Sequence, residues 1–181
     1  MASSKTKDAG IGLLTLRLIG GALLAGHGAQ KLFGWFEGPG LQGWSQAVDK
    51  MGVHPSRIWG PLAGVSEFAG GVLTALGLLN PFGPLGAIAA MTVATRKAHW
   101  GKPVWVSKGG AELALTNLAI AAAVAIEGPG RYSLDRLLGI RVPLWMRIAA
   151  TGATILGVAA ALRPDLFGVA QSPASGQPAG D

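Results

Sequence analysis

The chain has 181 residues, which suits one domain, and half of them are apolar, whereas only 13% are charged against roughly 25% in soluble domains. The net charge is +6, yet Lys and Arg stand mostly at the ends of apolar runs, where they meet lipid headgroups, and this placement argues against a nucleic-acid partner. The absence of cysteine excludes disulfides, thiolate catalysis, cysteine-held iron–sulfur clusters and covalently attached c-type haem within this chain.

The first apolar run covers residues 11–33 and is preceded by Lys5 and Lys7, as in a signal peptide. Arg17 inside the run, and the lack of a small-residue cleavage site soon after it, favour a helix that is retained. A turn rich in glycine and aromatic residues follows at residues 34–43. Residues 44–51 then place Trp44 and Val48 on one face, which predicts a short interfacial helix.

Four further apolar runs are separated by helix breakers or polar connectors. A turn of sequence NPFGP ends the second run, a basic loop with tryptophan ends the third, and the connector EGPGRYSLDRLLGI ends the fourth. The tail beyond the fifth run is rich in Ser, Pro, Gly and Gln, a composition typical of disorder. The four runs cover residues 58–79, 85–100, 109–126 and 143–162.

The lengths and composition of these runs predict an all-α integral membrane helical bundle. Each run has about 16–23 residues, close to the roughly 20 that cross a bilayer. The alternative is a soluble all-α protein, but its helices would show a polar face at every third or fourth residue, and these runs show almost none. Six tryptophans near the ends of the runs are typical of the membrane interface. We therefore expect five spans, with the termini on opposite sides.

Charged residues are expensive inside hydrocarbon, so each one needs a partner or a purpose. From the rise per residue, Arg17 and Glu67 both lie roughly 15 Å inside the membrane, on antiparallel helices. We therefore predict that they form an ion pair. The candidate residues for a polar pocket or proton relay are Arg17, His27, Lys31, Glu67, His99 and Glu112.

Four of these candidates are expected near one membrane face, the side of the first and third loops. His27 and Lys31 are four residues apart on one helical face, while His99 and Glu112 end two other helices on the same side. We predict that they line one pocket, with Arg17 and Glu67 beneath it. Each residue also has a purely structural explanation, as a snorkelling side chain, a core histidine or a structural ion pair.

A stripe of small residues on the second helix accompanies Glu67. Gly60, Gly64 and Gly71 share its helical face, so a neighbouring helix or a flat ligand can come close to the carboxylate. No metal-ligand motif has suitable spacing, and we predict no metal site. His27 and His99 as axial haem ligands remain a weak alternative, since nothing fixes their spacing.

The sequence resembles the DoxX family of bacterial membrane proteins. The resemblance is carried by RLIGGALLAGHGAQKLFGWFEGPGL, GVSEFAGGVLTALGLL, GGAELAL and GPGRYSLD, which together span about residues 10–138. It implies a four-helix membrane core, here over residues 10–138. The fifth run exceeds that core, so we expect residues 139–164 to form an additional membrane helix, with residues 1–9 as an N-terminal tail and residues 165–181 as a disordered tail. It also implies a multi-pass protein of the bacterial inner membrane with a cytoplasmic N-terminus.

Relatives in this family include subunits of thiosulfate:quinone oxidoreductase. The family's recurring polar positions are matched by Arg17, His27, Lys31, Glu67 and Glu112, and His99 falls where many members have a histidine that closes the third helix. After His99, however, WGKPVWVSKGG departs from the Gly-Phe-containing stretch often found there. The resemblance implies a subunit of quinone-linked redox chemistry, with a pocket that binds quinone or relays protons. One alternative is a non-enzymatic scaffold for a soluble redox or stress-response partner. Another is a small-molecule transporter, although no inverted repeat is evident.

Overall fold

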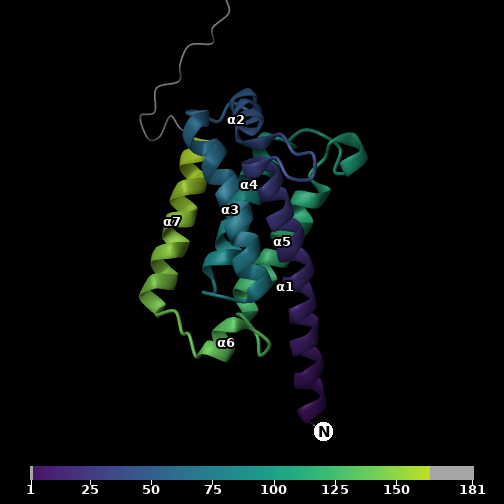
Figure 1. The fold of residues 1–181 in the computed structure, drawn as a ribbon, viewed down its shortest axis with the longest axis vertical. Helices are drawn as coiled ribbons and strands as arrows, with labels where there is room; N and C mark the ends of the chain where they lie inside the picture. Colours follow the sequence, from purple (N-terminus) through teal and green to yellow (C-terminus); the bar gives the residue numbers. More distant parts are fainter. Residues whose placement is uncertain (1, 164–181) are drawn as a thin grey trace, which may run out of the picture.

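A computed structural model describes residues 2–163, and every regular element in that range is helical (Figure 1). One short 3₁₀ turn, Val106–Lys108, accompanies the α-helices. The predicted all-α class is confirmed for this part of the chain, while the predicted disordered tail lies outside it. The α-helices are α1 (Ala2–Phe33), α2 (Gly40–Lys50), α3 (Ser56–Leu76), α4 (Phe82–Lys97), α5 (Glu112–Glu127), α6 (Leu134–Leu138) and α7 (Leu144–Leu162).

The five longer helices run side by side, and the two short ones lie at opposite ends of the bundle (Figure 1). Helix α1 packs chiefly against α3, which packs against α4, and α4 in turn contacts both α5 and α7. Helix α2 covers the end of the bundle where α1 finishes and α3 begins, and it contacts both of them. We call this the α2 end, and the opposite end, with α6, the α6 end.

The helix boundaries follow the breakers in the sequence. Gly77 ends α3 in the left-handed conformation with φ of 61°, which glycine adopts without strain. Helices α4 and α5 have 16 residues each, about 24 Å of helix, so the predicted shortness of these two runs is confirmed. Three differences from the sequence prediction appear: α1 already begins at Ala2, α2 begins at Gly40 inside the predicted turn, and the polar connector after α5 contains α6.

Glycines allow α1 and α3 to pack backbone against backbone. A Cβ atom placed on Gly28 would lie 2.2 Å from the backbone nitrogen of Phe68, and one on Gly71 would lie 2.4 Å from that of Ala25. Gly64 similarly faces Leu32 across the same interface. Two glycines of the stripe predicted on α3, Gly64 and Gly71, therefore pack against α1, whereas Gly60 faces Ser45 of α2.

The outer surface of the bundle is strongly apolar. Two helices are long and apolar enough to cross a membrane, Gly10–Phe33 and Leu144–Leu162, among the residues that the structure describes. Only 22% and 6% of their apolar stretches are buried within the protein, so nearly all of α7 is left to be covered by something else. Exposed apolar side chains on these two helices include Leu16, Ile19, Leu23, Ile148, Ile155 and Leu156.

Candidate functional site

A cavity of about 570 Å³ lies among α2, α3, α4 and α7, on the side of the bundle that α7 covers. The cavity walls are mainly apolar, because the helices that form them present Ala, Gly, Val and Trp to one another. The residues of these four helices that line the cavity include Trp44 and Val48 of α2, Trp59, Ala63, Ser66 and Glu67 of α3, Gly86, Ala90 and Val93 of α4, and Ala153, Thr154, Gly157 and Val158 of α7. Pockets of this size and character typically hold small, largely apolar ligands.

A buried ion pair forms the polar part of the cavity wall. Glu67 has a side chain only 2% exposed, and its Oε1 accepts a hydrogen bond from Nζ of Lys31, on α1. The ammonium of Lys31 also lies 4.2 Å from the ring centroid of Trp44, a cation–π contact. The indole N–H of Trp44 in turn donates to the carbonyl of Gly60, which fixes the ring. The charge on Glu67 is therefore compensated where water cannot reach it.

The second carboxylate oxygen of Glu67, Oε2, is buried and has no hydrogen-bond partner among residues 2–163. A carboxylate offers about four lone-pair positions, and a buried acceptor without a donor costs roughly 1–3 kcal/mol. This oxygen is therefore the buried atom of the ion pair that lacks a hydrogen bond, while Nζ of Lys31 has N–H groups beyond the one that Glu67 accepts.

Three other polar residues in the cavity wall are already engaged, whereas the indole N–H of Trp59 and the hydroxyl of Ser66 have no partner among the described residues. His99 Nδ1 lies 2.8 Å from the carbonyl of Gly109, and because a carbonyl only accepts, Nδ1 carries a proton. Lys97 donates to the carbonyl of Gly52 at 3.3 Å, and the hydroxyl of Thr154 donates to its own helix. No group of three His, Asp or Glu side chains converges to hold a metal ion within the part of the chain that is described.

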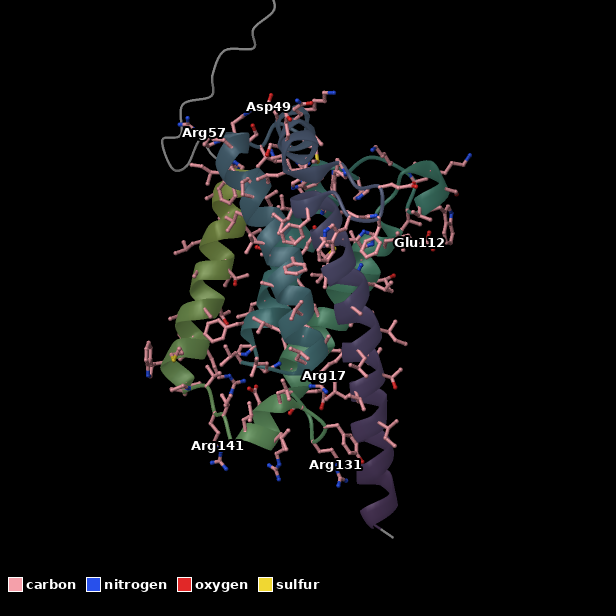
Figure 2. All side chains as sticks on the ribbon, in the orientation of Figure 1. Arg17, Asp49, Arg57, Glu112, Arg131 and Arg141 are labelled. Atoms are coloured by element: carbon pink, nitrogen blue, oxygen red, sulfur yellow. The ribbon has the colours of Figure 1, made fainter. Side chains whose placement is uncertain are left out.

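Three of the six candidate residues do not line this cavity. His27 is exposed on α1, and its Nδ1 lies 3.2 Å from Oε1 of Gln30. Glu112 begins α5 and accepts a hydrogen bond from the backbone of Val106, in the loop that leads into the helix. Figure 2 shows it on the side of the bundle away from α7. The predicted convergence of His27, Lys31 and Glu112 is therefore wrong, while Lys31, Glu67 and His99 do share one cavity.

The predicted ion pair between Arg17 and Glu67 is also wrong, because the two helices have a different register. Gly28 lies against Phe68, so Glu67 is level with Ala29 and within reach of Lys31. The depth prediction took Arg57 as level with His27, whereas α3 begins about two turns beyond the end of α1. Arg17 consequently lies about 18 Å from the level of Glu67, near the α6 end (Figure 2).

Arg17 instead belongs to a buried polar network at the α6 end. Its guanidinium donates to the carbonyl of Tyr132 at 2.5 Å and is only 1% exposed. A Cβ on Gly77 would collide with this guanidinium, so the glycine that ends α3 also makes space for it. The network explains why a charged residue stands so deep in the first apolar run.

Asp135 completes this network, and the sequence analysis missed it. Its two carboxylate oxygens accept from the backbone N–H groups of Leu79 and Asn80 at 2.8 and 2.9 Å. Its negative charge also attracts the positively charged guanidinium of Arg17. The signal in the sequence was the proline-rich turn after α3, whose backbone donors need acceptors once buried, together with an acidic residue between two arginines in the connector after α5.

Sequence reasoning also missed the contribution of α7 to the cavity. The fifth helix was expected to be an addition beside a four-helix core, yet it supplies one wall, with Gly157 at a place where a Cβ would meet nothing. Helix α7 makes its main contacts with α4 and leaves space between itself and α3. That space is the cavity.

Comparison with protein-family models matches residues 12–100 to the model described as DoxX. The match begins in α1 and runs through α4 to the loop that follows it, so it includes Arg17, Lys31, Glu67 and His99. Comparison with curated proteins and with solved structures gives no match.

Proposed function

This protein belongs to the DoxX family of membrane proteins through residues 12–100, and we propose that it binds a quinone in the cavity beside α7 as part of a membrane redox system. One observation carries the proposal: an apolar cavity of about 570 Å³ has a buried Lys31–Glu67 pair in its wall. A quinone ring is flat and apolar with oxygens at its edge, and such a site offers it apolar walls and polar groups for one oxygen.

The roles of the two charged residues follow from their chemistry. Lys31 and Glu67 contact the ring oxygen, and Glu67 exchanges a proton with it when the ring changes oxidation state. The chain has no cysteine, so we propose that a partner enzyme carries the electrons to or from the bound ring. The ligand reaches the cavity from the lipid, because Leu62 of α3 and Ala153 of α7 both line it and are exposed.

Filling the cavity tests this proposal. Gly157 lines it, and a Cβ atom added there meets no neighbouring atom within 4 Å, so Gly157→Leu should fold normally and place its side chain in the ligand's space. We expect the dissociation constant of a short-chain quinone, measured by isothermal titration calorimetry in detergent, to rise at least about tenfold, a loss of about 1.4 kcal/mol.

The matched control is Gly152→Leu, because Gly152 stands on the same helix with equally open surroundings but does not line the cavity. It should bind quinone as the wild type does. Unchanged binding in a folded Gly157→Leu protein would mean that the ligand sits elsewhere.

The membrane topology is a separate proposal. We propose that α1, α3, α4, α5 and α7 all cross the inner membrane of a bacterium, with the N-terminus in the cytoplasm. Arg57 at the α2 end and Arg131 and Arg141 at the α6 end support this, since charged groups mark both ends of an otherwise apolar bundle (Figure 2). Reporter enzymes fused before Ala2 and after Asp181 should show activity typical of opposite sides of the membrane. If both reporters lie on the same side, one of the five proposed spans does not cross the membrane.

A second candidate function is a scaffold that docks a soluble redox partner. Trp35 in the loop after α1, and Trp100 and Trp105 in the loop that also carries Lys102 and Lys108, favour it, because the three rings are 55–69% exposed. A partner that stays bound to the Gly157→Leu variant, in the absence of quinone, would support this function over the first.

A further inference from the structure

The cavity wall keeps both donors and acceptors, since the indole N–H of Trp59 and the hydroxyl of Ser66 have no partner among the described residues, but its one fully buried atom without a partner is an acceptor. Lys31 already donates to Glu67 and faces the ring of Trp44, and the indole N–H of Trp44 is bound to Gly60. The buried atom left over is Oε2 of Glu67, which has no partner among the described residues. His99, also in the wall, is already bound through Nδ1 to the carbonyl of Gly109.

The unpartnered Oε2 of Glu67 treats the two oxidation states of a quinone differently. The oxidised ring carries carbonyl oxygens, which only accept, so placing one beside Oε2 of Glu67 leaves both acceptors without a proton. The reduced ring carries hydroxyl groups, which donate, and a hydroxyl bound to a carboxylate makes a strong, charge-assisted hydrogen bond. Ser66, also in the wall, has a hydroxyl that can donate or accept and so favours neither form.

We infer that the cavity is a site for a ring hydroxyl, a quinol or a phenol, which it binds more tightly than the corresponding quinone through Oε2 of Glu67. The inference rests on the proposed function, because it names the form of the ligand at the same site. A hydrogen bond to a charged group contributes about 1.5–3 kcal/mol, so the reduced form should bind at least about tenfold more tightly. Each tenfold preference raises the reduction potential of the bound two-electron couple by about 30 mV.

Four probes separate the effect of the donor from that of redox chemistry. Decylubiquinol and decylubiquinone differ in oxidation state, while 4-octylphenol and its methyl ether differ only in the hydroxyl hydrogen and undergo no redox exchange. Binding of each is measured by isothermal titration calorimetry with the full chain in detergent, without oxygen. The Gly157→Leu variant provides the baseline for partition into micelles. We expect the quinol and the phenol each to bind at least tenfold more tightly than their partners.

The Glu67→Gln variant locates the preference. Glutamine keeps the shape and an acceptor for Lys31, but its amide presents N–H donors, so the preference should fall below threefold or reverse while the cavity still binds ligand. The wild-type comparison needs no variant, so it decides the matter even where Glu67→Gln misfolds.

The remaining outcomes distinguish the claim that the cavity binds a quinone from the claim that it prefers the reduced form. Equal or tighter binding of the quinone and the ether in the wild type overturns the preference and leaves the cavity as a quinone site. Binding of all four probes that is no stronger than in Gly157→Leu overturns both.

Discussion

Replacing Gly28 with alanine should destabilise the protein by about 3 kcal/mol, the upper part of the range for overpacked cores. The added methyl group would lie 2.2 Å from the backbone nitrogen of Phe68 and 2.6 Å from its Cα atom, and backbone cannot move aside as a flexible side chain can. Helices α1 and α3 must therefore separate. Lys31 is one turn further along α1, so the same displacement moves its ammonium away from Glu67.

The matched control for this experiment is Gly26→Ala, two residues earlier on α1. A Cβ on Gly26 meets no atom within 4 Å, and alanine is the better helix former by about 1 kcal/mol, so this change should be neutral or mildly stabilising. The measurement is the free energy of unfolding in mixed detergent micelles, with quinone binding as a second readout. If both variants unfold alike, α1 and α3 do not pack at backbone distance.

The second large effect is expected at the buried ion pair. Lys31→Met removes the partner of a carboxylate whose side chain is 2% exposed, and breaking a buried pair in this way costs about 3–5 kcal/mol. Glu67→Met should cost less, because the side chain of Lys31 is 18% exposed and its ammonium can reach toward the surface. The asymmetry follows from burial, since the residue that is left behind determines the penalty.

A double-mutant cycle measures the pair directly. The variant with methionine at both positions should be more stable than Lys31→Met alone, because no uncompensated charge remains in the bundle. Lys97→Met is the control, since Lys97 also lines the cavity but contacts only the exposed carbonyl of Gly52, and its change should stay within about 0.5 kcal/mol. Strict additivity of the two single changes would show that Lys31 and Glu67 do not interact.

The double variant allows the effect of the ion pair on stability to be measured apart from its effect on ligand binding. If the ion pair only holds α1 to α3, the refolded double variant retains quinol binding at the wild-type level. If Glu67 is also the acceptor for the ligand, folding recovers and binding does not. The two readouts together therefore assign the pair a structural role, a binding role or both.

The local features of the fold could be predicted from the sequence because they depend on neighbouring residues. Apolar runs long enough for helices, and the proline and glycine breakers between them, fixed where α3, α4, α5 and α7 begin and end to within a few residues. The stripe formed by Gly60, Gly64 and Gly71 predicted a close approach to α3, because a helix without side chains on one face leaves its backbone open to contact.

Pairing between helices could not be predicted in the same way. Depth calculated from the rise per residue depends on a common reference level, and α1 and α3 do not start or end at the same level. Because the register differs from the predicted one by a few turns, Glu67 pairs with Lys31 and not with Arg17. Arg17 lies instead in the network around Asp135.

The sequence by itself therefore determined an all-helical, apolar bundle and the set of charged residues that its interior must accommodate, since hydrophobicity and helix breaking act along the chain. Only the tertiary structure decided which of those charges meet, because the contacts between α1 and α3 set their register. It also decided that α7 closes a cavity instead of standing apart. Packing of α7 against α4, with space left beside α3, depends on the shapes of surfaces that are distant in the sequence.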